Sequence, residues 1–126
     1  MGNKYFCLII SVLLITGSRI HAQDTTSADG LFMAARKAAF DNKDYDLAIH
    51  YARKALTLNA NYTDILVFAG RVYTWKKEPD SARIYFEKAI SLEPPTVDAF
   101  AAYADMEYWN DSNEKALALL DKGLSV

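Results

Sequence analysis

Apolar residues recur three and four positions apart along most of this chain of 126 residues, and that spacing is typical of amphipathic α-helices. The pattern predicts six helices, at residues 29–41, 45–58, 63–76, 79–92, 97–109 and 113–125. Pro79 suits the first turn of the fourth helix, where its missing amide proton is not needed, and Pro94 and Pro95 end that helix. Asp111 and Glu114 have the spacing of a capping box for the sixth helix. The sequence therefore predicts an all-α fold.

The helical pattern repeats with a period of 34 residues. Four sets of positions carry the same or a similar residue at this spacing: Ala48, Ala82 and Ala116; Lys54, Lys88 and Lys122; Ala55, Ala89 and Gly123; and Leu56, Ile90 and Leu124. Small residues at such positions let the two helices of a pair approach closely, and larger apolar residues fill the seam between them. A fixed period of this length predicts a stack of helix pairs.

The middle unit of the repeat resembles the tetratricopeptide repeat (TPR). Its pattern runs Leu66, Ala69, Gly70, Tyr73, Ala82, Phe86 and Pro94, which is similar to the large, small and aromatic positions and the closing proline of that family. The resemblance implies a right-handed α-solenoid of three helix-turn-helix units, at about residues 29–62, 63–96 and 97–126. Two departures are Arg36, where the family prefers glycine, and Glu107, where it prefers an aromatic residue. The first helices of such units line a concave face that usually binds peptides or protein segments.

The first 22 residues have the anatomy of a cleavable secretory signal peptide. Lys4 is followed by an apolar run from Tyr5 to Ile15, and Ala22 supplies a small residue for cleavage. The run is about half of the roughly 20 residues that a bilayer span needs, so an uncleaved anchor is the weaker interpretation. Cleavage after Ala22 leaves a short linker at residues 23–28 and a repeat domain at residues 29–126. We expect an exported, periplasmic protein, with outer-membrane association as one option.

Composition narrows the classes of partner and of chemistry. The single cysteine, Cys7, lies in the signal segment, so we expect no disulfide and no thiol chemistry in the mature chain. Loss of Lys4 and Arg19 leaves 12 basic and 16 acidic residues, a net charge of −4. An interspersed, mildly acidic surface of this kind argues against nucleic acid as the main partner.

Enzyme chemistry finds little support in the sequence. The mature part has one histidine, His50, which we interpret as a solvated residue on the second helix of the first unit. Asp105 and Glu107 are interpreted as ordinary acids on a helix surface, with no nucleophile nearby. No glycine-rich phosphate loop and no spacing of three or four metal ligands is present. The sequence therefore predicts no enzyme, no cofactor, no metal site and no small-molecule substrate.

The predicted partner-binding groove follows the exposed side of the first helix of each unit. It comprises Lys37, Phe40, Phe68, Arg71, Trp75, Asp105, Tyr108 and Trp109. Arg71 and Lys37 could hold a carboxylate of a bound protein segment, while the aromatic residues supply the flat contact area that binding hot spots favour. Trp75 and Trp109 end their helices, and the preferred interpretation of both is that they cover the joint between repeats.

A narrower resemblance rests on a recurring Gly-Arg-x-Tyr-Thr-Trp and Glu-Tyr-Trp signature. Its residues are Gly70, Arg71, Tyr73, Thr74, Trp75, Glu107, Tyr108 and Trp109. This signature is similar to the periplasmic repeat segment at the front of YaiO-type outer-membrane β-barrel proteins. The chain lacks the alternating strand segments of about ten residues that a barrel requires, so the barrel itself is not expected in it. Two functions follow: an exported, noncatalytic binding module, or a fragment or truncated relative of such a protein whose repeats dock intramolecularly.

The last helix has an unusually wide apolar face. Leu117, Leu120 and Leu124 are its large members, and the face is as wide as that of the corresponding helix of the first unit. Solenoids usually end in a helix with a polar outer face. We therefore expect these leucines to form a docking face that is covered by another chain, by a second copy, by an outer-membrane barrel or by a further C-terminal segment.

Overall fold

The computed structural model describes residues 24–126, so the predicted signal peptide and its cleavage after Ala22 lie outside the described residues. This part of the chain contains six α-helices and no strand: α1 (Ala28–Phe40), α2 (Tyr45–Leu58), α3 (Thr63–Trp75), α4 (Pro79–Ile90), α5 (Val97–Trp109) and α6 (Asn113–Leu124). Each helix begins and ends within two residues of the predicted range, and the all-α prediction is confirmed. None of these six helices combines the length and the apolar character that crossing a bilayer requires.

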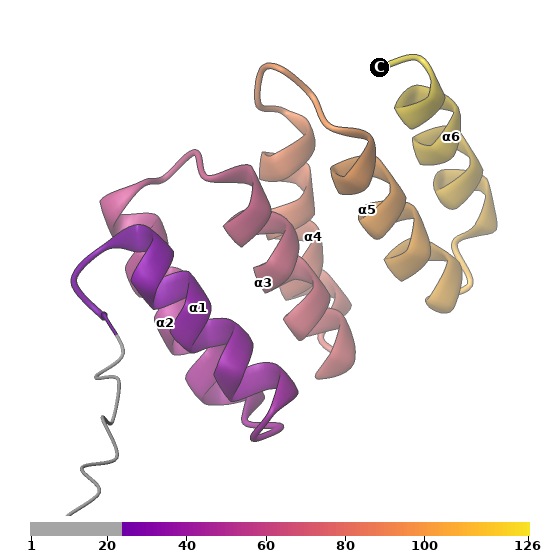
Figure 1. Cartoon of the computed structure of the whole chain (residues 1–126). Helices are drawn as coiled ribbons and strands as arrows, with labels where there is room; N and C mark the ends of the chain where they lie inside the picture. The colour runs from indigo at the N-terminus through magenta and orange to yellow at the C-terminus, as the bar shows by residue number, and fades with distance from the viewer. Residues whose placement is uncertain (1–23) are drawn as a thin grey trace, which may run out of the picture.

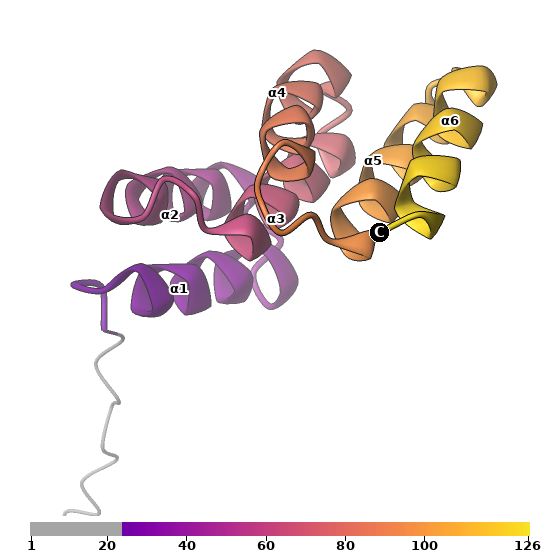
Figure 2. The ribbon, with the colours of Figure 1, turned by 90° about the horizontal axis from the view of Figure 1, so that it is seen from above.

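The helices form three antiparallel pairs that stack side by side (Figure 1). We call α1–α2 unit 1, α3–α4 unit 2 and α5–α6 unit 3. Seen from above, α2, α4 and α6 lie along one side of the stack and α1, α3 and α5 along the other (Figure 2). The extensive contacts between units join α2 to α3, α4 to α5 and α3 to α5. The first helices are therefore lined up along one face of a solenoid.

The turn inside each unit has the same backbone conformation. Lys43, Lys77 and Asp111, which are spaced 34 residues apart, have positive φ angles of 55°, 60° and 60°. The predicted capping box of Asp111 and Glu114 is therefore wrong, because a left-handed turn residue lies one position before the N-cap, Ser112. The prediction for Pro79 is correct, since it lies in the first turn of α4.

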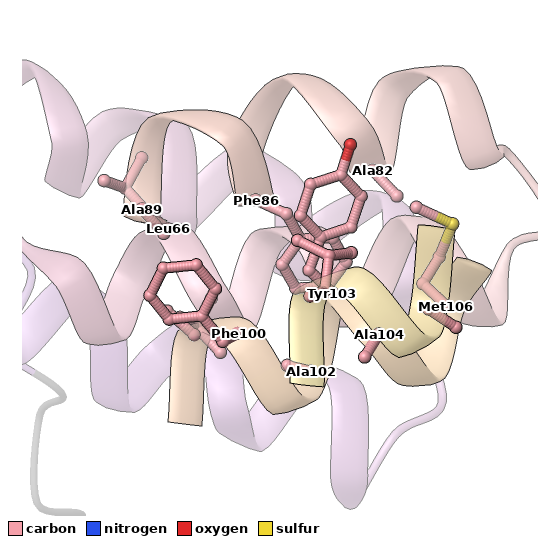
Figure 3. Close-up of a cluster of buried hydrophobic side chains, with 13 residues drawn as sticks. Leu66, Ala82, Phe86, Ala89, Phe100, Ala102, Tyr103, Ala104 and Met106 are labelled. Carbon is pink, nitrogen blue, oxygen red and sulfur yellow. The ribbon is translucent and has the colours of Figure 1, made fainter. Parts of the chain in front are cut away.

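Small residues let the helices approach closely. A Cβ atom added to Gly70 would lie 2.7 Å from the ring of Phe86, so this glycine leaves the space that the ring fills. Phe86 in turn stacks on Tyr103 of the next unit, with ring centroids 5.4 Å apart (Figure 3). The buried residues form two clusters, one centred on unit 1 and its contact with α3, and one centred on units 2 and 3. Stacking of units therefore produces the core, as the 34-residue period predicts.

Candidate functional site

Two adjoining hollows lie along the first helices. The larger has a volume of about 420 Å³ and is lined from α1, α3 and α5 by Phe32, Arg36, Phe40, Asp64, Val67, Phe68, Arg71, Trp75 and Asp98. The smaller, of about 170 Å³, is lined by Arg71, Thr74, Trp75, Ala102, Asp105, Met106 and Trp109. Arg71 and Trp75 belong to both linings, so the two hollows form one surface, which we call the concave groove.

Aromatic rings form the floor of the concave groove. Phe68 lies edge-on to Phe32, with ring centroids 5.4 Å apart, and to Phe40, at 6.3 Å. These contacts leave the side chain of Phe68 only 6% exposed. Phe68 therefore supports the groove from below, and the broad contact area predicted for it is not available at the surface.

Trp75 both covers a joint between units and lines the groove. Its ring contacts Phe40 at 5.6 Å and Tyr45 at 5.9 Å, both from unit 1, and 40% of the residue stays exposed. Trp109 differs, because it is 76% exposed and its one ring contact among the described aromatic residues is with its neighbour Tyr108. The structural interpretation therefore fits Trp75, whereas Trp109 presents most of its indole to solvent.

The charges in the concave groove are of both signs. Arg71 donates a hydrogen bond from Nη2 to Oδ1 of Asp98 at 2.9 Å, which links α3 to α5. The guanidinium of Arg36 lies 5.8 Å from the centre of the Phe32 ring and forms no ion pair with any residue of the described range 24–126. Arg36 is therefore a cation that a ligand carboxylate could approach without displacing a partner within this range.

The predicted groove residues are brought together in large part. Those that line the concave groove are Phe40, Phe68, Arg71, Trp75, Asp105 and Trp109. Lys37 instead lines a further hollow of about 350 Å³ on α1, which shares Arg36 and Phe40 with the concave groove. Tyr108 lines a groove between α5 and α6, which shares Asp105 with the concave groove. Sequence reasoning missed Phe32 and Arg36. The signal was present, because both precede Phe40 at intervals of four residues and so share its helix face.

Two of the three leucines predicted to form the docking face of α6 lie on one surface. Leu117 and Leu120 line the groove between α5 and α6, together with Tyr108. Leu124 lies outside that lining and is 85% exposed. The groove, which we call the terminal groove, has a volume of about 390 Å³.

Glu107 is not the surface acid that the sequence suggests. Its side chain is 0% exposed and accepts two hydrogen bonds from Arg83 of α4, at 2.8 and 2.9 Å, while Nζ of Lys115 of α6 lies 2.8 Å away. The hydrogen bonds from Arg83, with further help from Lys115, outweigh burial and hold the pKa of Glu107 at about 2. Nζ of Lys115 also donates to the hydroxyl of Tyr103 at 2.7 Å. This cluster therefore ties α4, α5 and α6 together.

The described side chains can be compared with the arrangements that metal-dependent and histidine-dependent catalysis require. His50 is exposed on α2. Within residues 24–126, no group of three or more histidine, cysteine, aspartate or glutamate side chains is placed to hold a metal ion. The low pKa of Glu107 follows from its two cationic partners, Arg83 and Lys115, which keep its carboxylate ionised and engaged in contacts within the protein.

Known proteins share the sequence pattern and the fold. The model of the tetratricopeptide repeat family matches residues 28–62 and 63–96, which contain α1 to α4. The RNA polymerase-associated protein CTR9 of Caenorhabditis elegans is 30% identical over 92 residues, which cover 70% of this chain and 8% of that protein. Two crystal structures of MamA each align with 81% of this chain, with a TM-score of 0.72 and 28% identity. The chain spans 59% and 55% of those MamA chains and less than a tenth of CTR9.

Proposed function

Because this chain belongs to the tetratricopeptide repeat family, we propose that it is a noncatalytic interaction module that holds a segment of another protein in the concave groove. The observation that carries the proposal is the continuity of that groove. The hollow that begins at α1 and the hollow that ends at Trp109 share Arg71 and Trp75, so one bound segment can contact the first helix of every unit.

The lining indicates the chemistry of the segment. Phe40 and Trp75 present aromatic surface for an apolar side chain, and the guanidinium of Arg36 lies beside them. Such a mixture of aromatic residues and arginine is typical of binding hot spots. We expect the segment to place an apolar residue over Trp75 and a carboxylate near Arg36. Arg71 adds a second cation once its contact with Asp98 is exchanged for the ligand.

Selection of peptides on the protein tests this proposal. Peptides would be selected from a displayed library, and their affinities would then be measured for the wild type and for Arg36→Ala, Arg71→Ala and Trp75→Ala. We expect each substitution to weaken binding at least tenfold, because each removes an arginine or aromatic side chain that lines the concave groove. Lys54→Ala, an exposed residue of α2 outside the groove, is the matched control and should leave affinity unchanged.

Thermal unfolding separates a lost contact from a lost fold, which matters most for Trp75 because it also packs on unit 1. Peptides that bind Arg36→Ala and Arg71→Ala as tightly as the wild type would place the binding site elsewhere and would refute the proposal.

We also propose that the protein is exported to the periplasm. The support is the sequence of Met1 to Ala22, with Lys4 before an apolar run and a small residue at the cleavage position. Expression of the full chain followed by mass spectrometry of the periplasmic fraction tests this. The expected product begins at Gln23, and an intact chain confined to the cytoplasm would contradict export.

The second candidate function is a structural one, as a relative of YaiO-type proteins whose repeats dock on a barrel. The motif that suggests it divides into two parts in the structure. Gly70, Tyr73 and Glu107 serve internal packing, whereas Arg71 and Trp75 line the concave groove. Binding of the protein to a purified, immobilised YaiO-type barrel tests this alternative. Retention of the wild-type protein on the barrel and loss of retention with Arg71→Ala would favour docking in the groove. No retention of the wild type would count against it.

A further inference from the structure

One repeat position reverses its charge along the first helices. Lys37, Arg71 and Asp105 are spaced 34 residues apart, so they are equivalent residues of α1, α3 and α5. Lys37 and Asp105 are exposed, and the side chain of Arg71 is 42% exposed. Stacking of the units places equivalent positions one after another across the stack, from α1 through α3 to α5 (Figure 2). The open side of the first helices therefore passes from cationic in units 1 and 2 to anionic in unit 3.

The unit 1 end of the concave groove favours a ligand carboxylate. Arg36 and Lys37 are exposed on α1, and neither forms an ion pair with any residue of the range 24–126. Asp41 lines the hollow that contains both, so two positive charges face one negative charge there. Asp64, which lines the larger hollow, lies in the first turn of α3, where the helix dipole offsets part of its charge. Positive charge is therefore in excess at this end.

The unit 3 end has the opposite character. Asp105 lines the smaller hollow and forms no ion pair within the part of the chain that the structure describes. Arg71, the cation in the same lining, is bound to Asp98 at 2.9 Å. Trp109 follows Asp105 by four positions, so it shares the same helix face, and it is 76% exposed. Because an indole ring attracts a cation over its face and a carboxylate attracts it by charge, Asp105 and Trp109 together favour a basic side chain.

The two ends are far enough apart to contact different residues of one bound segment. Neighbouring packed helices have axes about 8–10 Å apart, so α1 and α5, with α3 between them, are roughly 16–20 Å apart (Figure 2). An extended chain advances about 3.3 Å per residue. An acidic residue near α1 and a basic residue near α5 are therefore about five or six positions apart in an extended segment.

We propose that the concave groove selects a segment of a partner protein whose two ends carry opposite charges. An aspartate or glutamate lies at α1, an apolar residue lies over Trp75, and a lysine or arginine lies with its stem on Trp109 and its charge at Asp105. This inference rests on the proposed function, since it requires a segment in the concave groove. The pair Asp105 and Trp109 then determines specificity, because it disfavours a segment with an acidic residue at that end.

Peptide selection on the protein tests the charge pattern. Peptides selected from a displayed library should carry an acidic and a basic residue about five or six positions apart. A selected peptide and its variant with the basic residue replaced by glutamate are then compared by fluorescence anisotropy. We expect the replacement to weaken binding to the wild type about tenfold, because attraction to Asp105 becomes repulsion. Selected peptides that lack a basic residue overturn the proposal.

Asp105→Lys is the matched charge reversal. The other two units carry Lys37 and Arg71 at this position, so the repeat accommodates a cation there and the fold should be retained. With this variant the preference should invert, and the glutamate peptide should bind about fivefold more tightly than the selected peptide. An unchanged preference overturns the proposal.

Two further variants locate the basic residue of the ligand. Asp105 lines the terminal groove as well as the concave groove, whereas Trp109 belongs to the lining of the concave groove and Leu117 to that of the terminal groove. Trp109→Ala should weaken binding about fivefold, since it removes the ring beneath the cation. Leu117→Ala should leave affinity unchanged. Loss of affinity with Leu117→Ala and not with Trp109→Ala would place the basic residue in the terminal groove and would overturn the proposal.

The outcomes separate this inference from the proposed function. If Arg36→Ala and Trp75→Ala weaken binding while Asp105→Lys leaves the preference unchanged, the groove binds a segment and the charge pattern alone is wrong. If none of these variants changes affinity, both the function and the charge pattern are wrong. Concentration-dependent self-association of the wild type that Asp105→Lys abolishes would assign the groove to a second copy, and a partner segment would be the wrong occupant.

Discussion

At the scale of single residues, Glu107 joins units 2 and 3, because it contacts Arg83 of α4 as well as Lys115 of α6. A carboxylate that is fully buried would ordinarily resist ionisation, yet the bidentate contact with Arg83 and the contact with Lys115 hold its pKa at about 2, against an ordinary value of 4.5. The sequence could not show this easily, because the three residues are 24 and 8 positions apart and each is common on helix surfaces. The sequence did contain one sign of this role, because the positions equivalent to Glu107 in the other two units hold the uncharged residues Tyr73 and Ala39.

The low pKa of Glu107 predicts how acid destabilises the protein. The folded chain binds the proton of Glu107 more weakly than the unfolded chain does, so the ionised group raises the free energy of unfolding at pH values above about 4.5. That contribution is lost as the pH falls from about 4.5 towards 2. The difference between the two pKa values corresponds to about 3 kcal/mol. We therefore expect Glu107→Gln to lose about 3 kcal/mol at pH 7, as measured by urea unfolding.

Comparison of the two proteins across pH isolates this residue. Asp24, whose pKa is also lowered to about 2 by hydrogen bonds from Ser27 and Thr26, contributes equally to both and cancels. The loss of stability between pH 4.5 and 2 should be smaller in Glu107→Gln than in the wild type. The double variant Arg83→Met/Glu107→Leu removes the bidentate pair and leaves Lys115, whose exposed side chain can reach solvent, so it should recover most of the stability. Parallel pH profiles for wild type and Glu107→Gln would contradict the assignment.

At the scale of elements, the helix bounds could be predicted well and the turns less so. Helix bounds follow from apolar spacing, which burial enforces locally. The spacing of Asp111 and Glu114 alone suggested a capping box before α6. The structure instead gives Asp111 the left-handed conformation that the equivalent residues Lys43 and Lys77 also have, so the turn belongs to the repeat and not to the local pattern. Lysine gives no sign of a positive φ angle. In this position the conformation is held by hydrogen bonds that close the preceding helix, from the amides of Asp44, Glu78 and Ser112 to the carbonyl oxygens of Ala38, Tyr73 and Glu107.

The turn conformation predicts a stabilising substitution. A side chain at φ 60° brings Cβ close to the backbone, which costs about 1 kcal/mol that glycine avoids. Lys77→Gly should therefore raise the free energy of unfolding by about 0.5 kcal/mol after the extra freedom of glycine in the unfolded chain is counted. The urea midpoint measures the change. Lys54→Gly, in the middle of α2, is the control with the opposite sign and should cost about 1 kcal/mol. A lower midpoint for Lys77→Gly would contradict this account.

The groove residues show the same limit of sequence reasoning. Arg71, Trp75 and Asp105 could be predicted because helix geometry alone places them on the open side of α3 and α5. Phe68 lies on the same side of α3, but its exposure depends on Phe32 and Phe40 of a neighbouring unit. Contacts between units are therefore the part that a single-helix projection misses.

At the scale of the whole molecule, the joints between units have different chemistry. The joint between units 2 and 3 is fastened by the pair Arg83 and Glu107, whereas the corresponding positions at the joint between units 1 and 2 are the apolar Ile49 and Tyr73. Extensive contacts link each unit only to its neighbours. Stability in such a stack is close to a sum of unit and neighbour contributions, so damage at one joint should stay near that joint.

Hydrogen exchange distinguishes local loosening from global loosening. In Glu107→Gln we expect the amides of α5 and α6 to exchange about a hundredfold faster at pH 7, which is the effect of about 3 kcal/mol on an opening equilibrium. The amides of α1 and α2 should keep most of their protection, because Ile49 and its cluster do not touch the altered charge. Ile49→Ala is the mirror control, and it should loosen α1 and α2 more than α6. If both variants accelerated exchange equally in all six helices, the chain would unfold as a single cooperative unit, and the neighbour-by-neighbour description would be wrong for this protein.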